Sequence, residues 1–246
     1  MIGKNSENGE TMKRKVVIKN KKNKKKSRIF IIIILLAISL GIFAAIKYSK
    51  SGFDDGVLCV CIDPGHGGSD STGATDGETR LEKEDNLLLS LAVKEKLENS
   101  GAKVIMTRTD DESISLKERC RIANAKNADY FICLHRNSAA DKSAHGSEVW
   151  IKNIPTKEET LLAENILANL EKAGISQNRG VKKGYRDSAA LNYYINSNTN
   201  MPSCLVELGF ISNKKDNDDF DKKLDLYAQA IADAVIATYT AGMTNK

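Results

Sequence analysis

The sequence predicts an α/β fold: a single layered domain with a mixed, largely parallel central sheet flanked by helices, preceded by one N-terminal transmembrane helix. Three observations support this prediction. Apolar, β-branched runs of strand length alternate with helical patterns of about 12–18 residues, as in layered α/β domains. Histidines and a carboxylate lie at the ends of several of these runs. One uncharged segment near the N-terminus is long enough to cross a bilayer.

The first 56 residues divide into three segments. Residues 1–28 hold 11 Lys/Arg and 2 Asp/Glu, a net charge of +9, and we expect them to form a basic cytoplasmic tail. Residues 29–46 carry no charge and are the expected transmembrane anchor, with a cleaved signal segment as the alternative. Residues 47–56 are a short polar linker. The rest of the chain is then expected outside the cytoplasm, anchored or, after cleavage, secreted.

The total charge of +5 does not indicate a nucleic-acid partner. Because the tail carries +9, residues 29–246 carry −4, whereas a nucleic-acid-binding domain carries a basic patch. Because the tail lies next to the expected anchor, binding to anionic lipid is a simpler explanation of its positive charge than binding to nucleic acid. The five cysteines form no CxxC pair, which argues against a thiolate metal site and a disulfide framework. We expect them to be buried and unpaired.

Each element of the domain is predicted from its residue pattern. Apolar, β-branched runs bounded by Gly, Pro, Asn or Asp predict strands, apolar residues at helical spacing predict helices, and Gly-, Ser- and Asp-rich stretches predict loops. In chain order, these patterns predict a strand over 57–63, a loop over 67–80, a helix over 82–99, a strand over 102–107, a helix over 115–127, strands over 129–134 and 146–151, a helix over 157–172, a loop over 175–190, strands over 191–195 and 203–206, and a helix over 214–239. Ser115 is the expected N-cap of its helix, with Glu118 completing a capping box.

Two histidines and a carboxylate suggest a metal site. His66 lies in a Pro-Gly-His-Gly-Gly turn after the first strand, and His135 follows the strand over 129–134. Ligands of open α/β sheets bind at the carboxyl ends of strands, so both imidazoles are expected at one rim. Two imidazoles and one carboxylate are a common ligand set for hydrolytic Zn²⁺. Glu82, Glu84 and Asp85 all lie near the start of one helix, and the pattern alone does not choose among them.

Glu207 is the candidate catalytic group. It lies in an apolar run, where a carboxylate is costly unless it is paired or functional, and burial would raise its pKa to suit a general base. A buried ion pair with Arg108 or Arg136 is the alternative. Asp63 is expected either to orient an imidazole or to begin the loop with a hydrogen bond.

Several loop residues remain as weaker candidates. Arg108, Arg136, Asn137 and Arg179 are candidate substrate-binding residues that can polarise a carbonyl or hold carboxylates, although such residues in loops are commonly surface groups. The third histidine, His145, lies in a polar stretch and is expected in a surface loop.

Several short sequence motifs, taken in their order along the chain, resemble those of the zinc-dependent N-acetylmuramoyl-L-alanine amidases of the Amidase_3 family. The resemblance covers about residues 57–240. The motifs that carry the resemblance are Ile62-Asp63-Pro64-Gly65-His66-Gly67-Gly68, Leu81-Glu82-Lys83 followed by Asn86-Leu87, His135-Arg136-Asn137-Ser138, Asn178-Arg179-Gly180-Val181 and Met201-Pro202 through Ser212-Asn213. The resemblance implies that His66, Glu82 and His135 bind one Zn²⁺ and that Glu207 is catalytic. One departure is the Asn196-Ser197 pair, where many relatives have Leu-Arg, which puts that arginine's substrate contact in question.

By this resemblance, the chain is a peptidoglycan hydrolase. It would cleave the amide between N-acetylmuramic acid and the L-alanine of the stem peptide, through a zinc-bound water and a Glu general base. Its partners would be peptidoglycan and, through the N-terminal helix, the membrane. Residues 57–240 would be the catalytic domain and 241–246 a tail. The alternatives are another zinc amide hydrolase, such as a carboxypeptidase acting within the stem peptide, and an inactive wall-binding relative. A protein activator and a role in cell separation, wall turnover or the spore cortex remain open.

Overall fold

The structure, a computed structural model, describes residues 56–69 and 73–244. The predicted tail, anchor and nearly all of the linker therefore lie outside the described residues. Within the described part, no helix combines the length and apolarity needed to cross a membrane.

A six-stranded sheet with the order β2-β1-β3-β6-β4-β5 forms the centre. Its strands are β1 (Cys59–Pro64), β2 (Lys103–Met106), β3 (Tyr130–Asn137), β4 (Ser147–Ile151), β5 (Asn178–Lys183) and β6 (Ser203–Phe210). Strands β2, β1, β3 and β6 run parallel, whereas β4 is antiparallel to β6 and parallel to β5. This arrangement confirms the predicted mixed, largely parallel sheet.

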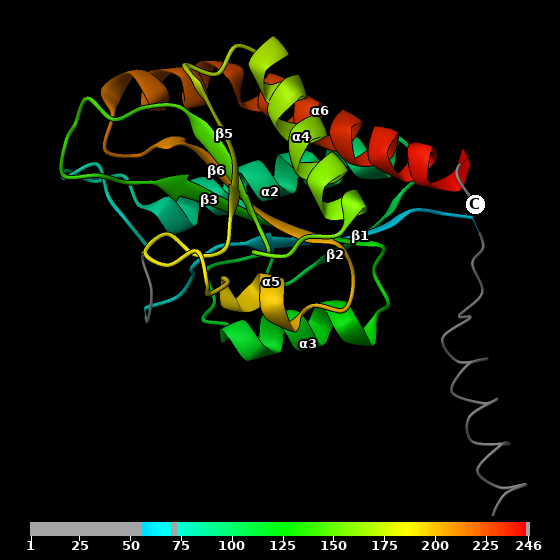
Figure 1. Cartoon of the computed structure of the whole chain (residues 1–246). Helices are drawn as coiled ribbons and strands as arrows, with labels where there is room; N and C mark the ends of the chain where they lie inside the picture. The colour runs from blue at the N-terminus through cyan, green and yellow to red at the C-terminus, as the bar shows by residue number, and fades with distance from the viewer. Residues whose placement is uncertain (1–55, 70–72, 245–246) are drawn as a thin grey trace, which may run out of the picture. The chain divides into compact units, whose positions relative to one another are not determined.

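Helices cover both faces of the sheet (Figure 1). On one face lie α2 (Glu82–Asn99), α4 (Lys157–Lys172) and α6 (Lys214–Thr244), and on the other lie α3 (Leu116–Ala125) and α5 (Tyr194–Asn198). The sheet is thus enclosed between two helical layers. This explains why its central strands read as continuous apolar runs.

Alternation along β3 distributes its side chains between two cores. Ile132 and Leu134 belong to the core shared with α2, α4 and α6, whereas Phe131 and Cys133 belong to the smaller core beside α3 and α5. In β6, Val206 faces the larger core and Leu205 the smaller one. By the same alternation, His135 of β3 and Glu207 of β6 share a face.

The helices largely follow their predicted patterns. The bounds of α2 and α4 agree with the sequence, and the Ser115 side chain accepts a hydrogen bond from the Glu118 backbone N–H, which confirms the N-cap. The Glu118 carboxylate, however, binds Arg121, so the predicted capping box is incomplete. Cys61, Cys120, Cys133 and Cys204 are free and buried, as expected, whereas Cys59 is partly buried.

Several element boundaries were predicted incorrectly. Both β3 and β6 extend beyond their predicted ends at Leu134 and Val206, because backbone pairing continues after the apolar run has ended. The strand expected over 191–195 is instead a loop entering α5, and β5 lies inside the expected loop over 175–190. As a partly exposed edge strand, β5 needs no apolar alternation. Helix α6 runs to Thr244, into the segment predicted as a tail.

Candidate metal and catalytic site

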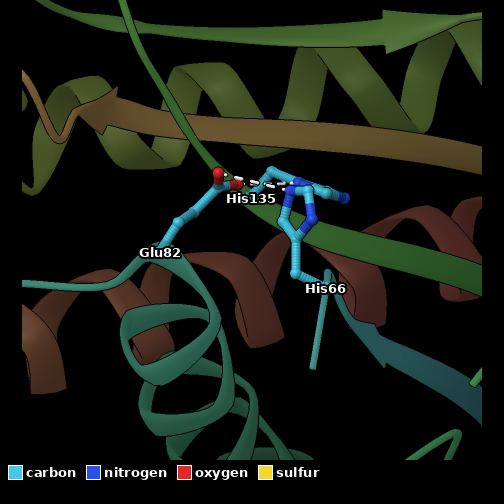
Figure 2. Close-up of side chains that lie close together, drawn as sticks. All are labelled: His66, Glu82 and His135. Atoms are coloured by element: carbon cyan, nitrogen blue, oxygen red, sulfur yellow. Dashed lines mark hydrogen bonds and ion pairs between the residues drawn. The ribbon is translucent and has the colours of Figure 1, made fainter. Parts of the chain in front are cut away.

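The three predicted metal ligands lie together (Figure 2). His66 follows β1, Glu82 is the first residue of α2, and His135 lies in β3. The Nε2 atom of His66 lies 3.3 Å from one Glu82 carboxylate oxygen, and Nδ1 of His135 lies 2.8 Å from the other. One ligand atom from each residue can be chosen so that all lie within 4.8 Å of one another.

The surroundings of this cluster fit a metal ion. Two imidazoles and a carboxylate are a donor set that Zn²⁺ uses while keeping a position open for water. The backbone also approaches the ligands closely at two glycines. A Cβ at Gly65 would lie 2.3 Å from the His135 ring, and one at Gly73 would lie 2.6 Å from the Glu82 carboxylate. Any side chain at either position would displace a ligand.

Hydrogen bonds from two arginine side chains to backbone carbonyls hold the turn that carries His66. His66 has a φ of 60°, a left-handed conformation that is uncommon for a residue other than glycine. Arg119 donates to the carbonyl oxygens of Pro64 and His66, and Arg108 donates to those of Pro64 and Gly65. These bonds offset the cost of the strained conformation and fix the direction of the imidazole.

The electrostatics of the cluster favour a cation. Burial opposes ionisation of Glu82, but hydrogen bonds from His135 and His66 outweigh it and hold the pKa of this carboxyl well below its usual range. Burial likewise disfavours a charged His135, yet Glu82 raises the pKa of that imidazole above its usual value. The carboxylate thus stays ionised in a nearly closed environment and attracts positive charge, which a divalent cation can supply.

Glu207 lies beside the cluster, in register with His135 on the neighbouring strand. It is 5% exposed, and its Oε2 atom is buried without a hydrogen-bond partner among the described residues. Burial raises the pKa of this carboxyl to about 7, with the negative charges of Glu82 and Glu148 acting in the same direction against His135 and Arg186. A carboxyl with this pKa can accept and return a proton near neutral pH.

The predicted alternative for Glu207, an ion pair with Arg108 or Arg136, is wrong. The cation beside it is Arg186, whose Nη2 lies 3.6 Å from Glu207 Oε1. Arg186 was missed because it lies in a polar stretch whose sequence pattern indicates only a loop. Glu148, the pairing partner of Glu207 on β4, was missed as well.

A pocket of about 600 Å³ opens over these groups. The three candidate ligands and Glu207 line one part of it. Another part of the lining is an apolar and aromatic wall formed by Ile114, Leu116, Tyr193 and Tyr194, in or next to α3 and α5. The pocket can therefore take a substrate that presents a polar reacting group to the ligands and less polar surface to the wall.

Of the four weaker candidates, Arg136 alone belongs to the pocket lining. Arg136 donates its backbone N–H to Glu82, but its guanidinium points to the opposite face of β3 and pairs with Asp85. The Arg108 guanidinium is buried and bonded to backbone carbonyls. Arg179 pairs with Glu148.

Asn137, His145 and Asp63 have polar partners of their own. Asn137 donates to Glu148 and accepts from Arg186, which brings it next to the pocket. His145 lies against Ser176, outside the ligand cluster. Asp63 bonds to Thr107, Arg119 and Cys133, so it anchors the loop start.

Comparisons with known proteins point to one family. The family described as N-acetylmuramoyl-L-alanine amidase matches residues 60–237. The chain is 36% identical over 178 residues to the uncharacterized protein YqiI of Bacillus subtilis, covering 72% of this chain and 81% of that one. It is 35% identical over 186 residues to the probable cell wall amidase LytH of Staphylococcus saprophyticus, covering 74% of this chain but 58% of LytH.

A solved structure shares the fold. The N-acetylmuramoyl-L-alanine amidase from Clostridium difficile 630 superposes with a TM-score of 0.67 at 29% identity, covering 74% of this chain and 96% of that one. With the family match over residues 60–237, these similarities lead to one assignment. The chain belongs to the N-acetylmuramoyl-L-alanine amidase family.

Proposed function

We propose that this protein hydrolyses the amide between N-acetylmuramic acid and the L-alanine of the stem peptide of peptidoglycan, as a zinc enzyme with Glu207 as general base. The observation that carries the proposal is the juxtaposition of the His66–Glu82–His135 cluster with the buried, unpartnered carboxylate oxygen of Glu207. Family membership supports the choice of bond, and the donor set supports the choice of metal.

The three metal ligands and Glu207 would have different roles in the reaction. His66, Glu82 and His135 would hold the ion, which when bound lowers the pKa of a water molecule and polarises the scissile carbonyl. Glu207 would take the proton of the attacking water as the new carbon–oxygen bond forms. It would then deliver this proton to the departing nitrogen as the carbon–nitrogen bond breaks. The products are a lactyl carboxylate and a peptide with a free L-alanine amino terminus.

We also propose the division of the chain predicted from its sequence. Residues 1–28 would form a basic cytoplasmic tail, 29–46 a membrane anchor and 47–56 a linker, and the domain over 57–240 would act on the cell-wall side. The basic charge before the apolar segment supports this orientation. The relative LytH, a probable cell wall amidase, is consistent with it.

The metal assignment predicts a selective loss of zinc. Purified protein should bind one Zn²⁺ per chain, and replacing His66, Glu82 or His135 by alanine should weaken binding by at least about 100-fold, because each change removes a ligand. Competition with a chromophoric chelator measures the affinity. His145→Ala removes the third histidine from outside the cluster and should keep wild-type affinity. Equal losses in all four variants would contradict the assignment.

Substitution of the general base predicts an inactive enzyme with intact metal binding. Glu207→Gln keeps the size of the side chain but cannot accept a proton, so turnover of peptidoglycan should fall by about 10²–10⁴-fold at unchanged zinc content. Mass spectrometry of the released muropeptides identifies the bond. Peptides beginning with L-alanine support the amidase, whereas loss of residues from the carboxyl end would indicate a carboxypeptidase.

The raised pKa of Glu207 predicts a pH-dependent stability difference in chelated protein. Burial raises the pKa of this carboxyl from its ordinary value of 4.5 to about 7 in the folded state. Since the folded state favours the protonated form, this contribution is complete below pH 4.5 and is lost as the pH rises through 7. Glu207→Gln should therefore be more stable than wild type at pH 8, by up to about 3 kcal/mol, with a smaller gap at pH 5. Urea unfolding at both pH values tests this, and parallel profiles would refute it.

The proposed anchor predicts membrane association. The full chain should sediment with membranes after alkaline carbonate washing. The wash disrupts electrostatic contacts, whereas an apolar helix that spans the bilayer stays embedded in it. A variant that starts at Ser51 should appear in the soluble fraction. Recovery of the full-length chain in the wash would show that residues 29–46 neither span nor anchor.

A further inference from the structure

One cation of the pocket is not used by the chemistry described above. Three arginines line the pocket: Arg119, Arg136 and Arg186. Arg119 is 4% exposed and bonded to Asp63 and backbone carbonyls, and Arg136 is 2% exposed and paired with Asp85. The Arg186 side chain is 49% exposed. Among these three, Arg186 is thus the one whose guanidinium remains accessible to a ligand.

The position of the Arg186 guanidinium is set by its neighbours. Its Nη2 donates to Asn137 Oδ1 at 3.0 Å and lies 3.6 Å from Glu207 Oε1. The ring of the preceding residue, Tyr185, lies 4.8 Å from that of Tyr193, and both residues line the pocket. A guanidinium has five N–H donors, so these contacts leave donors for a ligand in the pocket.

The distance to Glu207 defines which part of the substrate meets Arg186. Glu207 must return its proton to the leaving nitrogen, so this nitrogen has to come within hydrogen-bond reach of the carboxylate. The guanidinium beside Glu207 then lies on the leaving-group side, which is the peptide side of the scissile bond. An extended residue spans about 3.5 Å, so a carboxylate on the residue after L-alanine falls within reach of a long side chain.

We propose that Arg186 is a substrate-binding residue that recognises a carboxylate of the stem peptide on the leaving-group side of the scissile amide. The proposal rests on the proposed amidase function and adds the orientation of the substrate. Arginine suits this task because its planar fork matches a carboxylate and remains charged at any working pH. Asn137 positions the guanidinium through the hydrogen bond that it accepts from Nη2, and Asn137 is in turn held by Glu148.

The test compares two substrates that differ by one charge. The full chain, zinc-loaded in mild detergent, is assayed on N-acetylmuramoyl dipeptides that begin with L-alanine and end in either a free carboxylate or a carboxamide. Wild type should prefer the carboxylate by about tenfold or more, expressed in KM, as expected for a charge-assisted bond. Arg186→Ala should lose this preference, with KM for the carboxylate raised about tenfold and kcat changed less than about threefold. Arg186→Lys should retain part of it.

Lys183→Ala is the matched control, since it removes one positive charge from the exposed end of β5, outside the pocket lining. It should keep the wild-type preference. An equal loss of kcat on both substrates in Arg186→Ala would show that Arg186 acts only through Glu207 or the loop structure. An unchanged preference would show that it does not bind the carboxylate. Either result overturns the proposal, whereas failure of wild type to cleave peptidoglycan would refute the amidase function itself.

Discussion

The buried carboxylate of Glu82 is the interaction on which the site depends. One of its oxygens accepts a hydrogen bond from the Arg136 backbone and lies next to His135, and the other accepts from the Ala74 backbone and lies next to His66. A single side chain at the start of α2 therefore contacts the turn after β1, the strand β3 and the loop that leads into α2. Its position in the first turn also gives the charge a favourable helix dipole, which offsets part of the cost of burial.

Strand alternation determines which side chains reach the pocket. Because β3 remains a strand through Asn137, consecutive residues point to opposite faces, so that His135 faces the pocket and Arg136 faces α2 and α6. The same rule gives Glu207 the face of His135. The adjacent residues His135 and Arg136 thus lie on opposite faces of the sheet. The first side chain reaches the pocket, and the second packs against α2 and α6.

Much of this architecture could be predicted from the sequence, and the remainder has identifiable physical causes. Apolar runs and helical spacing predicted the layered sheet and the bounds of α2 and α4. The grouping of His66, Glu82 and His135 followed from strand ends and from the family resemblance. Arg186 could not be predicted, since its importance comes from a non-local contact with Glu207, and β5 escaped prediction because a partly exposed edge strand lacks an apolar pattern.

The hydrogen bonds that hold the His66 turn have a consequence for how the protein matures. Arg108 and Arg119 hold the turn through backbone carbonyls, and these bonds are made entirely by the polypeptide. The turn that carries the candidate ligand His66 is thus held by bonds within the polypeptide, whereas small metal-dependent domains fold only around their ion. Under the proposed function, export and folding would precede loading, and the availability of free metal at the final destination would switch the enzyme on.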